Sequence, residues 1–247
     1  MQIHQTVRLG HFHPVYCEDA LWIDEIQDEI YLAAVMDGCT MGKESHFAAS
    51  LVVKLLRKSV KNTGYLAWTD PGHPLNHRDL GALGKEMLRA LFIDLKACAQ
   101  TLFLAQEELL TTLNLCLVDT KQDGVWHIVV GDGFSAVEGK VIDWDQNNKP
   151  DYLGYHLGES FDSWFAEQQQ IGLYEGVKSF AIASDGVDAF ENLDKRSRHF
   201  QQEIPFYLLL DEEFLALPRM LEKKIELLEK DFGEIATDDL AIIRMRW

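Results

Sequence analysis

The chain has 247 residues, 47% hydrophobic and 26% charged, so it has the composition of a globular protein long enough to bury a core. Its formal net charge of −17 argues against a nucleic-acid backbone or an anionic membrane as partner, because both bind basic surfaces. The scattered cysteines form no Cys-x-x-Cys pair, which argues against a zinc site. The chain starts without the apolar core of a signal peptide and has no apolar run of membrane-spanning length, which predicts a cytoplasmic protein with free thiols.

The first half of the chain predicts extended segments followed by helices. Extended pieces are expected over residues 6–24, and the apolar run 31–36 predicts a buried strand. Residues 44–61 carry apolar side chains at helical spacing and end in a basic cluster, which suits the C-terminus of a helix. Proline and glycine predict a loop at 69–74, before a long helix expected over 79–110.

The second half predicts a group of short strands and two further helices. The expected strands cover residues 111–119, 125–131, 134–138, 140–144, 178–183 and 240–245, with a hairpin turn at 121–124. The expected helices cover residues 187–192 and 212–230. Residues 146–170 are polar and aromatic and fit no element. Their aromatic residues could form a flap over a site or simply pack.

Two groups of strands, with two groups of helices between and after them, indicate an α+β fold. We therefore expect helices packed outside a mainly antiparallel pair of sheets. No internal repeat or low-complexity linker divides the sequence, so residues 1–247 are expected to form a single domain.

Four apolar runs each end at, or begin just after, an aspartate. The aspartates are Asp37, Asp132, Asp185 and Asp238. Strand ends at one sheet edge can gather carboxylate oxygens around hard divalent cations. Any one Asp-Gly pair is equally an ordinary turn dipeptide, so it is the set of four that favours a metal site.

Such a site would suit two Mg²⁺ or Mn²⁺ ions, which can activate a water at neutral pH and hold phosphoryl oxygens. Other phosphatase chemistries lack their sequence signatures here. No cysteine has an arginine six residues later, Asp37 has no second aspartate two residues on, and no G-x-x-x-x-G-K-[ST] loop is present. The sequence thus favours metal-assisted hydrolysis over a covalent nucleophile.

Six motifs occur in an order that resembles a known family. They are Glu18-Asp19, Asp37-Gly38, Thr111-Thr112, Gly131-Asp132, Asp185-Gly186 and Asp238-Asp239. Together with their flanking strands they resemble the metal-dependent serine/threonine protein phosphatases of type 2C, over nearly the whole chain. The resemblance implies a β-sandwich flanked by helices on both outer faces, in four α-β-β-α layers. It also implies hydrolysis of phosphoserine or phosphothreonine in a phosphorylated protein substrate by a water activated by two metal ions.

The resemblance implies three direct carboxylate ligands. Asp37 would bridge two Mg²⁺ or Mn²⁺ ions, and the carbonyl of Gly38 would bind one of them. Asp185 and Asp238 would complete the set, so catalysis would depend on all three aspartates.

Three further acids would have weaker roles in the family pattern. Glu18 and Asp19 would act mainly through waters on the metals. Asp132 matches an aspartate that in some members helps to hold a third, weaker metal. Its usual partner aspartate would be Ala189 here, with Asp188 one position earlier, so the resemblance leaves the third metal open.

The phosphate-binding side departs from the family pattern. Many members have an arginine four residues before the glutamate, where this chain has Pro14. Three basic residues nearby could replace it or be structural: Arg8, His11 and His13. Cys39 stands where the family often has histidine or methionine, of which a histidine could donate a proton to the leaving group, and Gly133-Phe134 replaces Ser-Arg.

These departures keep a second hypothesis open, namely a catalytically weak or inactive phosphatase-like module that binds or regulates a partner. The sequence does not fix the physiological substrate, the metal used, the regulatory partner or the oligomeric state.

Overall fold

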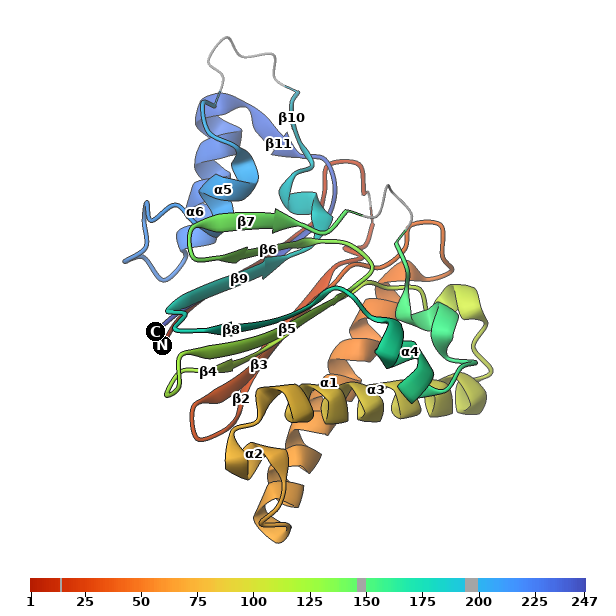
Figure 1. The fold of residues 1–247 in the computed structure, drawn as a ribbon. Helices are drawn as coiled ribbons and strands as arrows, with labels where there is room; N and C mark the ends of the chain where they lie inside the picture. Colours follow the sequence, from red (N-terminus) through yellow and green to blue (C-terminus); the bar gives the residue numbers. More distant parts are fainter. Residues whose placement is uncertain (14, 146–149, 194–199) are drawn as a thin grey trace.

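Two five-stranded sheets stack face to face at the centre of the molecule (Figure 1). The computed structural model describes residues 1–13, 15–145, 150–193 and 200–247. The first sheet has the strand order β1-β12-β9-β6-β7, formed by Gln2–Arg8, Leu240–Arg246, Ser179–Ala183, Phe134–Val137 and Lys140–Asp143. The second has the order β2-β3-β4-β5-β8, formed by Ala20–Gln27, Ile30–Met36, Leu113–Asp119, Gly124–Val130 and Ile171–Glu175. Neighbouring strands in both sheets are antiparallel.

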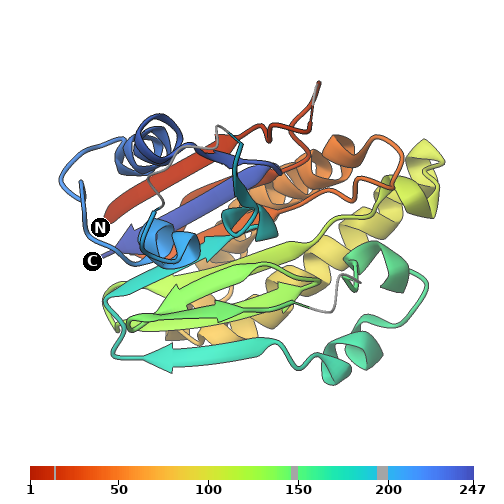
Figure 2. The ribbon, with the colours of Figure 1, turned by 90° about the horizontal axis from the view of Figure 1, so that it is seen from above.

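Helices cover the outer face of each sheet, so the layers follow the order α-β-β-α (Figures 1 and 2). Helices α1 (Ser45–Thr69) and α3 (Leu80–Leu102) pack on the second sheet. Helices α5 (Ile204–Leu209) and α6 (Met220–Leu227) pack on the first. The predicted α+β sandwich with helices on both outer faces is confirmed.

Smaller elements connect these layers. Helices α2 and α4 cover Pro74–His77 and Phe161–Glu167, and strands β10 and β11, Phe190–Asn192 and Glu234–Ala236, form a two-stranded ribbon. Single helical turns occur at Gln106–Glu108, Leu153–His156, Asp185–Val187 and, as a π turn, Leu228–Phe232. Within the described ranges no helix combines the length and the apolarity needed to cross a bilayer.

The two-residue period of the strands divides the apolar side chains among three layers. In β3, Leu32 and Met36 belong to the core under α1 and α3, whereas Ala33 and Val35 face the space between the sheets. Strand β12 repeats the pattern, with alternate residues in the core under α5 and α6 and in the inter-sheet core. Both central strands are therefore apolar on two faces, which explains their continuous hydrophobic runs.

The strand register brings all four aspartate-bearing strand ends to one edge of the sandwich. In the first sheet Ala183, at the end of β9, pairs with Phe134 at the start of β6 and with Ile242 near the start of β12. In the second sheet the end of β5 pairs with the start of β4. The aspartates that follow β3, β5 and β9 and the one that precedes β12 consequently lie on the same side.

Several elements differ from the sequence prediction. Helix α1 ends at Thr69 rather than at 61, so the basic cluster lies inside the helix and not at its C-terminus. Helix α3 ends at Leu102 rather than at 110, because Phe103 adopts a left-handed conformation with φ 57° and its N–H bonds to the Ala99 carbonyl. Residues 187–192, predicted as a helix, form a single turn and then β10. Helix α6 begins at Met220, eight residues after the predicted start, just beyond Pro218.

A glycine in α3 allows close packing of that helix on β5. A Cβ added at Gly84 would lie 2.5 Å from Cε3 of Trp126, a ring buried under the helix. We predict that Gly84→Ala lowers the free energy of unfolding by about 1–3 kcal/mol, because the ring must shift in a filled core. Urea denaturation measures the change.

Gly81→Ala is the matched control, since it lies in the same helix and a Cβ there would meet only Asp79 Oδ1, at 3.6 Å. Alanine at this position should leave stability unchanged or raise it by up to about 1 kcal/mol. Equal effects of the two substitutions would show that packing against Trp126 is not the cause.

Candidate metal centre

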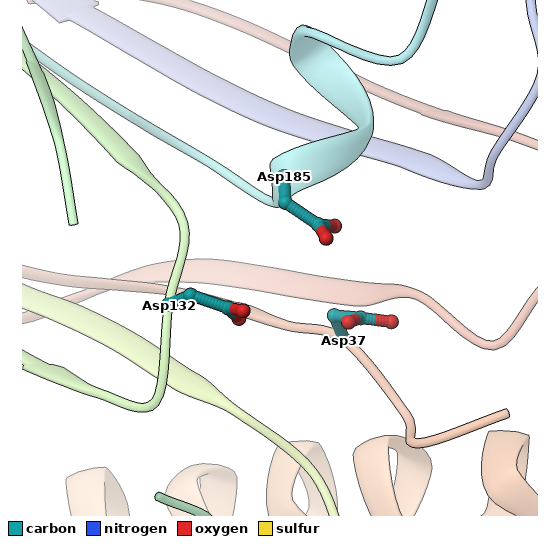
Figure 3. Close-up of side chains that lie close together, drawn as sticks. All are labelled: Asp37, Asp132 and Asp185. Carbon is teal, nitrogen blue, oxygen red and sulfur yellow. The ribbon is translucent and has the colours of Figure 1, made fainter. Parts of the chain in front are cut away.

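Three aspartates from three different strand ends converge at this edge of the sandwich. Asp37, Asp132 and Asp185 each place a carboxylate oxygen within 4.8 Å of the others. Figure 3 shows the three side chains pointing toward one another from separate segments of the chain. Oxygen donors at this spacing match the ligand preference of Mg²⁺ and Mn²⁺.

The carboxylates lie in a cleft of about 680 Å³ that also includes Asp238. Its other walls come from the segment after β3 and from residues 150–155. The described lining consists of Asp37, Gly38, Cys39, Thr40, Met41, Asp132, Pro150, Asp151, Tyr152, Tyr155, Asp185 and Asp238. This lining contains five acids and no lysine, arginine or histidine, so the cleft attracts cations.

The backbone around Asp37 is fixed by two threonines that follow helix α3 and the turn after it. The Asp37 N–H donates to Thr112 Oγ1 at 3.0 Å, and the Asp37 carbonyl accepts from Thr111 Oγ1 at 2.8 Å. Gly38 is required next to it, since an added Cβ would lie 2.3 Å from the Ser45 carbonyl oxygen. The start of α1 can therefore approach the end of β3 only at a glycine.

Asp19 is buried beside this group of carboxylates. Its Oδ2 accepts a 2.5 Å hydrogen bond from Ser184 Oγ, the residue before Asp185. Its Oδ1 is buried without a hydrogen-bond partner in the described part of the chain. A buried carboxylate oxygen without a donor is costly for the fold, and a cation or its water would satisfy it.

Burial and mutual repulsion raise the pKa of these carboxyl groups. Desolvation raises the pKa of Asp37 and Asp19 above the ordinary aspartate value, and the negative charge of Asp185 adds to both shifts. Asp185 keeps solvent exposure, but desolvation by its neighbours and the charges of Asp132 and Asp238 raise its pKa to about 6. Crowded acids that resist ionisation in this way are stabilised when a divalent cation supplies opposite charge.

Glu18 does not belong to the converging group. Its Oε1 accepts from Ser45 Oγ at 2.5 Å and its Oε2 from Thr40 Oγ1 at 2.9 Å, so it ties the segment before β2 to the start of α1. The Glu18 N–H donates to Asp239 Oδ2 at 2.5 Å. Both carboxylate oxygens of Glu18 thus accept hydrogen bonds from hydroxyl groups, next to the cleft but outside the converging group.

Asp239 is a structural anchor that the sequence pattern missed. Its side chain is buried and accepts from Gly10 N–H at 2.7 Å as well as from Glu18. His13 Nδ1 lies 2.8 Å from Asp239 Oδ2, and although burial lowers the pKa of His13, the hydrogen bond and charge of Asp239 raise it overall. The second aspartate of the Asp238-Asp239 pair therefore fixes the segment between β1 and β2.

A second acidic hollow of about 350 Å³ adjoins the cleft and shares Asp132 and Asp185 with it. It adds Asp143, Asp145 and Asp188. The sequence comparison left the partner of Asp132 undecided between positions 188 and 189, and the structure places both residues in this lining. Asp143 is the last residue of β7 and Asp145 follows two positions later, and neither is next to a glycine, so no turn motif indicated them.

Comparison with known protein families shows which family the chain belongs to. A family model for protein phosphatase 2C matches residues 14–223. The chain belongs to the protein phosphatase 2C family. The match includes Glu18, Asp37, Asp132 and Asp185, whereas Asp238 lies beyond it and is placed in the cleft by the structure. A comparison with curated proteins found no match.

Solved structures of the family share the fold. A bacterial serine phosphatase superposes with a TM-score of 0.62 at 15% identity, covering 100% of this chain and 98% of the other. The SiaA phosphatase 2C domain of Pseudomonas aeruginosa gives 0.60 at 15%, covering 99% and 85%. The catalytic domain of the serine/threonine phosphatase PstP, solved with two manganese ions, gives 0.55 at 15%, covering 98% and 96%. At these identities the likeness establishes the fold.

The structure accounts for two of the cations considered as replacements for the family arginine. Arg8 forms an ion pair with Glu229 near α6, and His13 is held by Asp239. His11 is exposed and packs edge-on against Phe12. Pro14 lies outside the described residues. None of the three is among the residues that line the cleft.

The aromatic residues of 146–170 divide between two roles. Tyr152 and Tyr155 line the cleft, with their rings 5.6 Å apart. Trp164 is buried in the core under α3, against Phe92 and Phe161. The packing interpretation therefore holds for Trp164, whereas a flap over the cleft stays a prediction for the two tyrosines. Residues 146–149 of this segment lie outside the described ranges.

A buried amide links the two sheets behind the aspartates. Asn114 on β4 donates through Nδ2 to the carbonyls of Phe134, at 2.8 Å, and Ala183, at 3.3 Å. These residues lie two positions from Asp132 and Asp185. Asn114 Oδ1 lies 2.7 Å from Nε2 of His127, whose pKa burial lowers to about 3, so a neutral imidazole donates this bond.

We predict that Asn114→Leu lowers the free energy of unfolding by about 2 kcal/mol or more, because it leaves the His127 N–H buried without an acceptor. In a protein that already carries His127→Leu this donor is absent, so Asn114→Leu should lower the free energy of unfolding by less than it does in the wild type. A double-mutant cycle by urea denaturation should therefore give a coupling energy of about 1 kcal/mol or more. Strict additivity would contradict the link.

The raised carboxyl pKa values predict how the metal-free protein responds to pH. A folded-state pKa above the unfolded value gives stability that is present at low pH and is lost as pH rises through the folded pKa. We expect the melting temperature in chelator to fall between about pH 5 and 7.5. The loss should be about 1.4 kcal/mol for each pH unit over which the folded state holds one extra proton.

His13 acts in the same direction, because its pKa is also raised. His127 and His4 act in the opposite direction up to about pH 6.5, because burial lowers the pKa of both imidazoles. Asp185→Asn should reduce the slope, since it removes a carboxyl whose pKa lies near 6. The repulsion between these acids would be contradicted if the wild type and Asp185→Asn had the same dependence of melting temperature on pH in chelator.

Proposed function

We propose that this protein is a phosphatase that hydrolyses phosphoserine or phosphothreonine in a phosphorylated protein, using two Mg²⁺ or Mn²⁺ ions, and that residues 1–247 act as one domain. The observation that carries the proposal is the convergence of Asp37, Asp132 and Asp185 in an acidic cleft. Membership of the protein phosphatase 2C family supports it. So does the presence of two manganese ions in the related PstP structure.

The donor set fits hard divalent cations. Asp37, Asp185 and Asp238 would be direct ligands, together with the carbonyl of Gly38, and Asp132 would serve a third ion. Bound cations would offset the repulsion that raises the pKa of Asp19, Asp37 and Asp185. They would also give the buried Asp19 oxygen the partner that it lacks in the described part of the chain.

Glu18 and Asp19 would act through waters. Both already use a carboxylate oxygen in a hydroxyl hydrogen bond, Glu18 to Ser45 and Asp19 to Ser184. These bonds orient the two side chains, as partners of a metal site commonly are.

Divalent ions, when bound, supply an activated water and offset the negative charge of the phosphoryl group. The protein's own contribution is to hold the carboxylates at fixed strand ends and to shape the cleft. No side chain in the described lining can form an ion pair with a phosphate. Among the described lining residues, therefore, none would replace the ions as the source of counter-charge for the substrate phosphate.

The cleft also bears on the substrate class. Met41 is 93% exposed and Tyr155 45% exposed, so the acidic centre has an apolar rim. A phosphorylated serine or threonine on a protein surface could present its phosphate to the acids while neighbouring apolar side chains contact this rim.

A second candidate is a phosphatase-like module that binds a partner without efficient hydrolysis. Two features favour it: the described lining has no cation, and Cys39 occupies the position of the family's proton donor. Metal binding combined with turnover separates the two candidates.

We predict that the protein hydrolyses p-nitrophenyl phosphate and a phosphothreonine peptide in millimolar Mn²⁺ and loses this activity in chelator. Asp37→Asn should lower kcat/KM by about 100-fold or more, because it removes a direct ligand. Asp162→Asn is the control, since this exposed acid on α4 pairs with Arg89 and lies away from the cleft lining. Activity that survives chelation, or persists in Asp37→Asn, would overturn the mechanism.

Two bound Mn²⁺ ions without turnover of either substrate would instead support the binding module.

Bound Mn²⁺ should also raise the melting temperature. Saturation at about 100 times the dissociation constant contributes about 2.7 kcal/mol.

A further inference from the structure

Helix α1 is basic in an otherwise acidic protein. It contains Lys54, Arg57, Lys58 and Lys61 and no aspartate or glutamate. The whole chain has 23 lysines and arginines against 40 aspartates and glutamates. One exposed helix face therefore carries a local charge opposite to that of the molecule.

These cations gather around one hollow. An open depression of about 370 Å³ is lined by the four cations and Asn62, which together we name the basic face of α1. All five residues are exposed. Lys58 pairs with Asp94 of α3 at 2.6 Å, and within the described ranges the other three cations form no ion pair. Most of the charge of this face is thus available to a ligand.

Exposed aromatic side chains continue the basic face toward the end of the helix. Tyr65 is 65% exposed and Trp68 is 81% exposed, with their ring centroids 6.4 Å apart. Positions 54, 57, 61, 65 and 68 follow the three-and-four spacing that places residues on one side of a helix. Arginine, tyrosine and tryptophan are the residues that most often dominate binding energy at protein interfaces.

We propose that this surface docks a short acidic segment of a partner protein that also carries an apolar side chain. The acids would lie over Lys54, Arg57 and Lys61, and the apolar residue over Tyr65 and Trp68. The distance from position 54 to 68 along a helix is about 21 Å, which an extended segment of about six residues spans. We choose an acidic segment because the basic face of α1 attracts negative charge, whereas the net negative charge of the rest of the protein repels it.

The net charge also disfavours larger polyanions. A membrane or a long nucleic acid would extend past the basic face and meet the acidic remainder of the surface, with net charge −17 for the molecule. Charge interactions act over about 10 Å at 0.1 M salt, so a compact segment confined to this helix avoids that repulsion. A short peptide segment fits the size of the face.

The docking surface is separate from the metal centre. Its first cation lies nine residues beyond Ser45, about 14 Å along the helix, and none of its residues lines the cleft. The opposite side of α1 is committed to the core through Ala49, Val52 and Leu56. The proposal therefore does not depend on hydrolytic activity.

The test measures binding of a fluorescein-labelled peptide of about four glutamates and aspartates followed by Leu-Phe, with blocked ends, to the full chain by fluorescence anisotropy. Arg57→Glu with Lys61→Glu should weaken binding about tenfold or more. Trp68→Ala should weaken it several-fold, and added salt should weaken wild-type binding. Replacing the peptide's acids by glutamine and asparagine should abolish it.

The matched control is Lys140→Glu with Lys223→Glu, which makes the same change in net charge at exposed positions on β7 and α6. This variant should bind the peptide within about twofold of wild type, and unchanged melting temperatures should accompany both pairs. Failure of the wild type to bind, or equal weakening by both pairs, would overturn the proposal. If the wild type bound anionic vesicles or RNA more tightly than the peptide, the basic face of α1 would be assigned to a membrane or a nucleic acid and the proposal would be wrong. The same holds if the wild type formed a dimer that only the α1 variant lost, which would assign the face to a second copy of the chain.

Discussion

The structure depends on holding several carboxyl groups close together against their mutual repulsion. Carboxylate oxygens of Asp37, Asp132 and Asp185 lie within 4.8 Å of one another, and desolvation makes ionisation of these groups harder still, although Asp185 keeps solvent exposure. Such a cluster persists because the backbone that carries it is fixed elsewhere, by strand pairing and by the hydroxyl groups of threonine and serine. The energetic cost of the acidic cleft is thus offset by the sandwich behind it.

The four-layer architecture explains how that compensation is possible. Three apolar cores, one under each helix layer and one between the sheets, immobilise the strands whose ends form the cleft. Asn114 and His127 add a polar connection across the inter-sheet core, directly behind two of the aspartates. Apolar packing alone would let the two sheets slide over each other more freely. A buried hydrogen-bonded link of this kind has a defined geometry, so it fixes the relative position of the sheets.

The sequence predicted most of the fold because apolar runs followed by Asp-Gly mark β3, β5 and β9, and the apolar run after Asp238-Asp239 marks β12. It failed where tertiary contacts override local pattern: β10 forms because residues 190–192 pair with β11, more than forty positions away. The aspartates of the cleft were visible as strand ends, whereas the anchoring role of Asp239 was not. Nothing in an Asp-Asp pair distinguishes a residue facing the cleft from one that accepts bonds from residues 10 and 18.

Under the proposed function, the missing cation in the described cleft lining has a thermodynamic consequence. A phosphoryl group entering an array of five acids without metal would be repelled, so substrate and divalent ions must bind with positive coupling. Linkage requires this coupling to be reciprocal, so a phosphorylated ligand tightens metal binding as much as metal tightens the ligand. Family members with an arginine beside the metals carry part of that counter-charge in the protein. In this chain no residue of the described cleft lining shares that role, so the ions would carry it there, and apparent substrate affinity would depend more steeply on metal concentration.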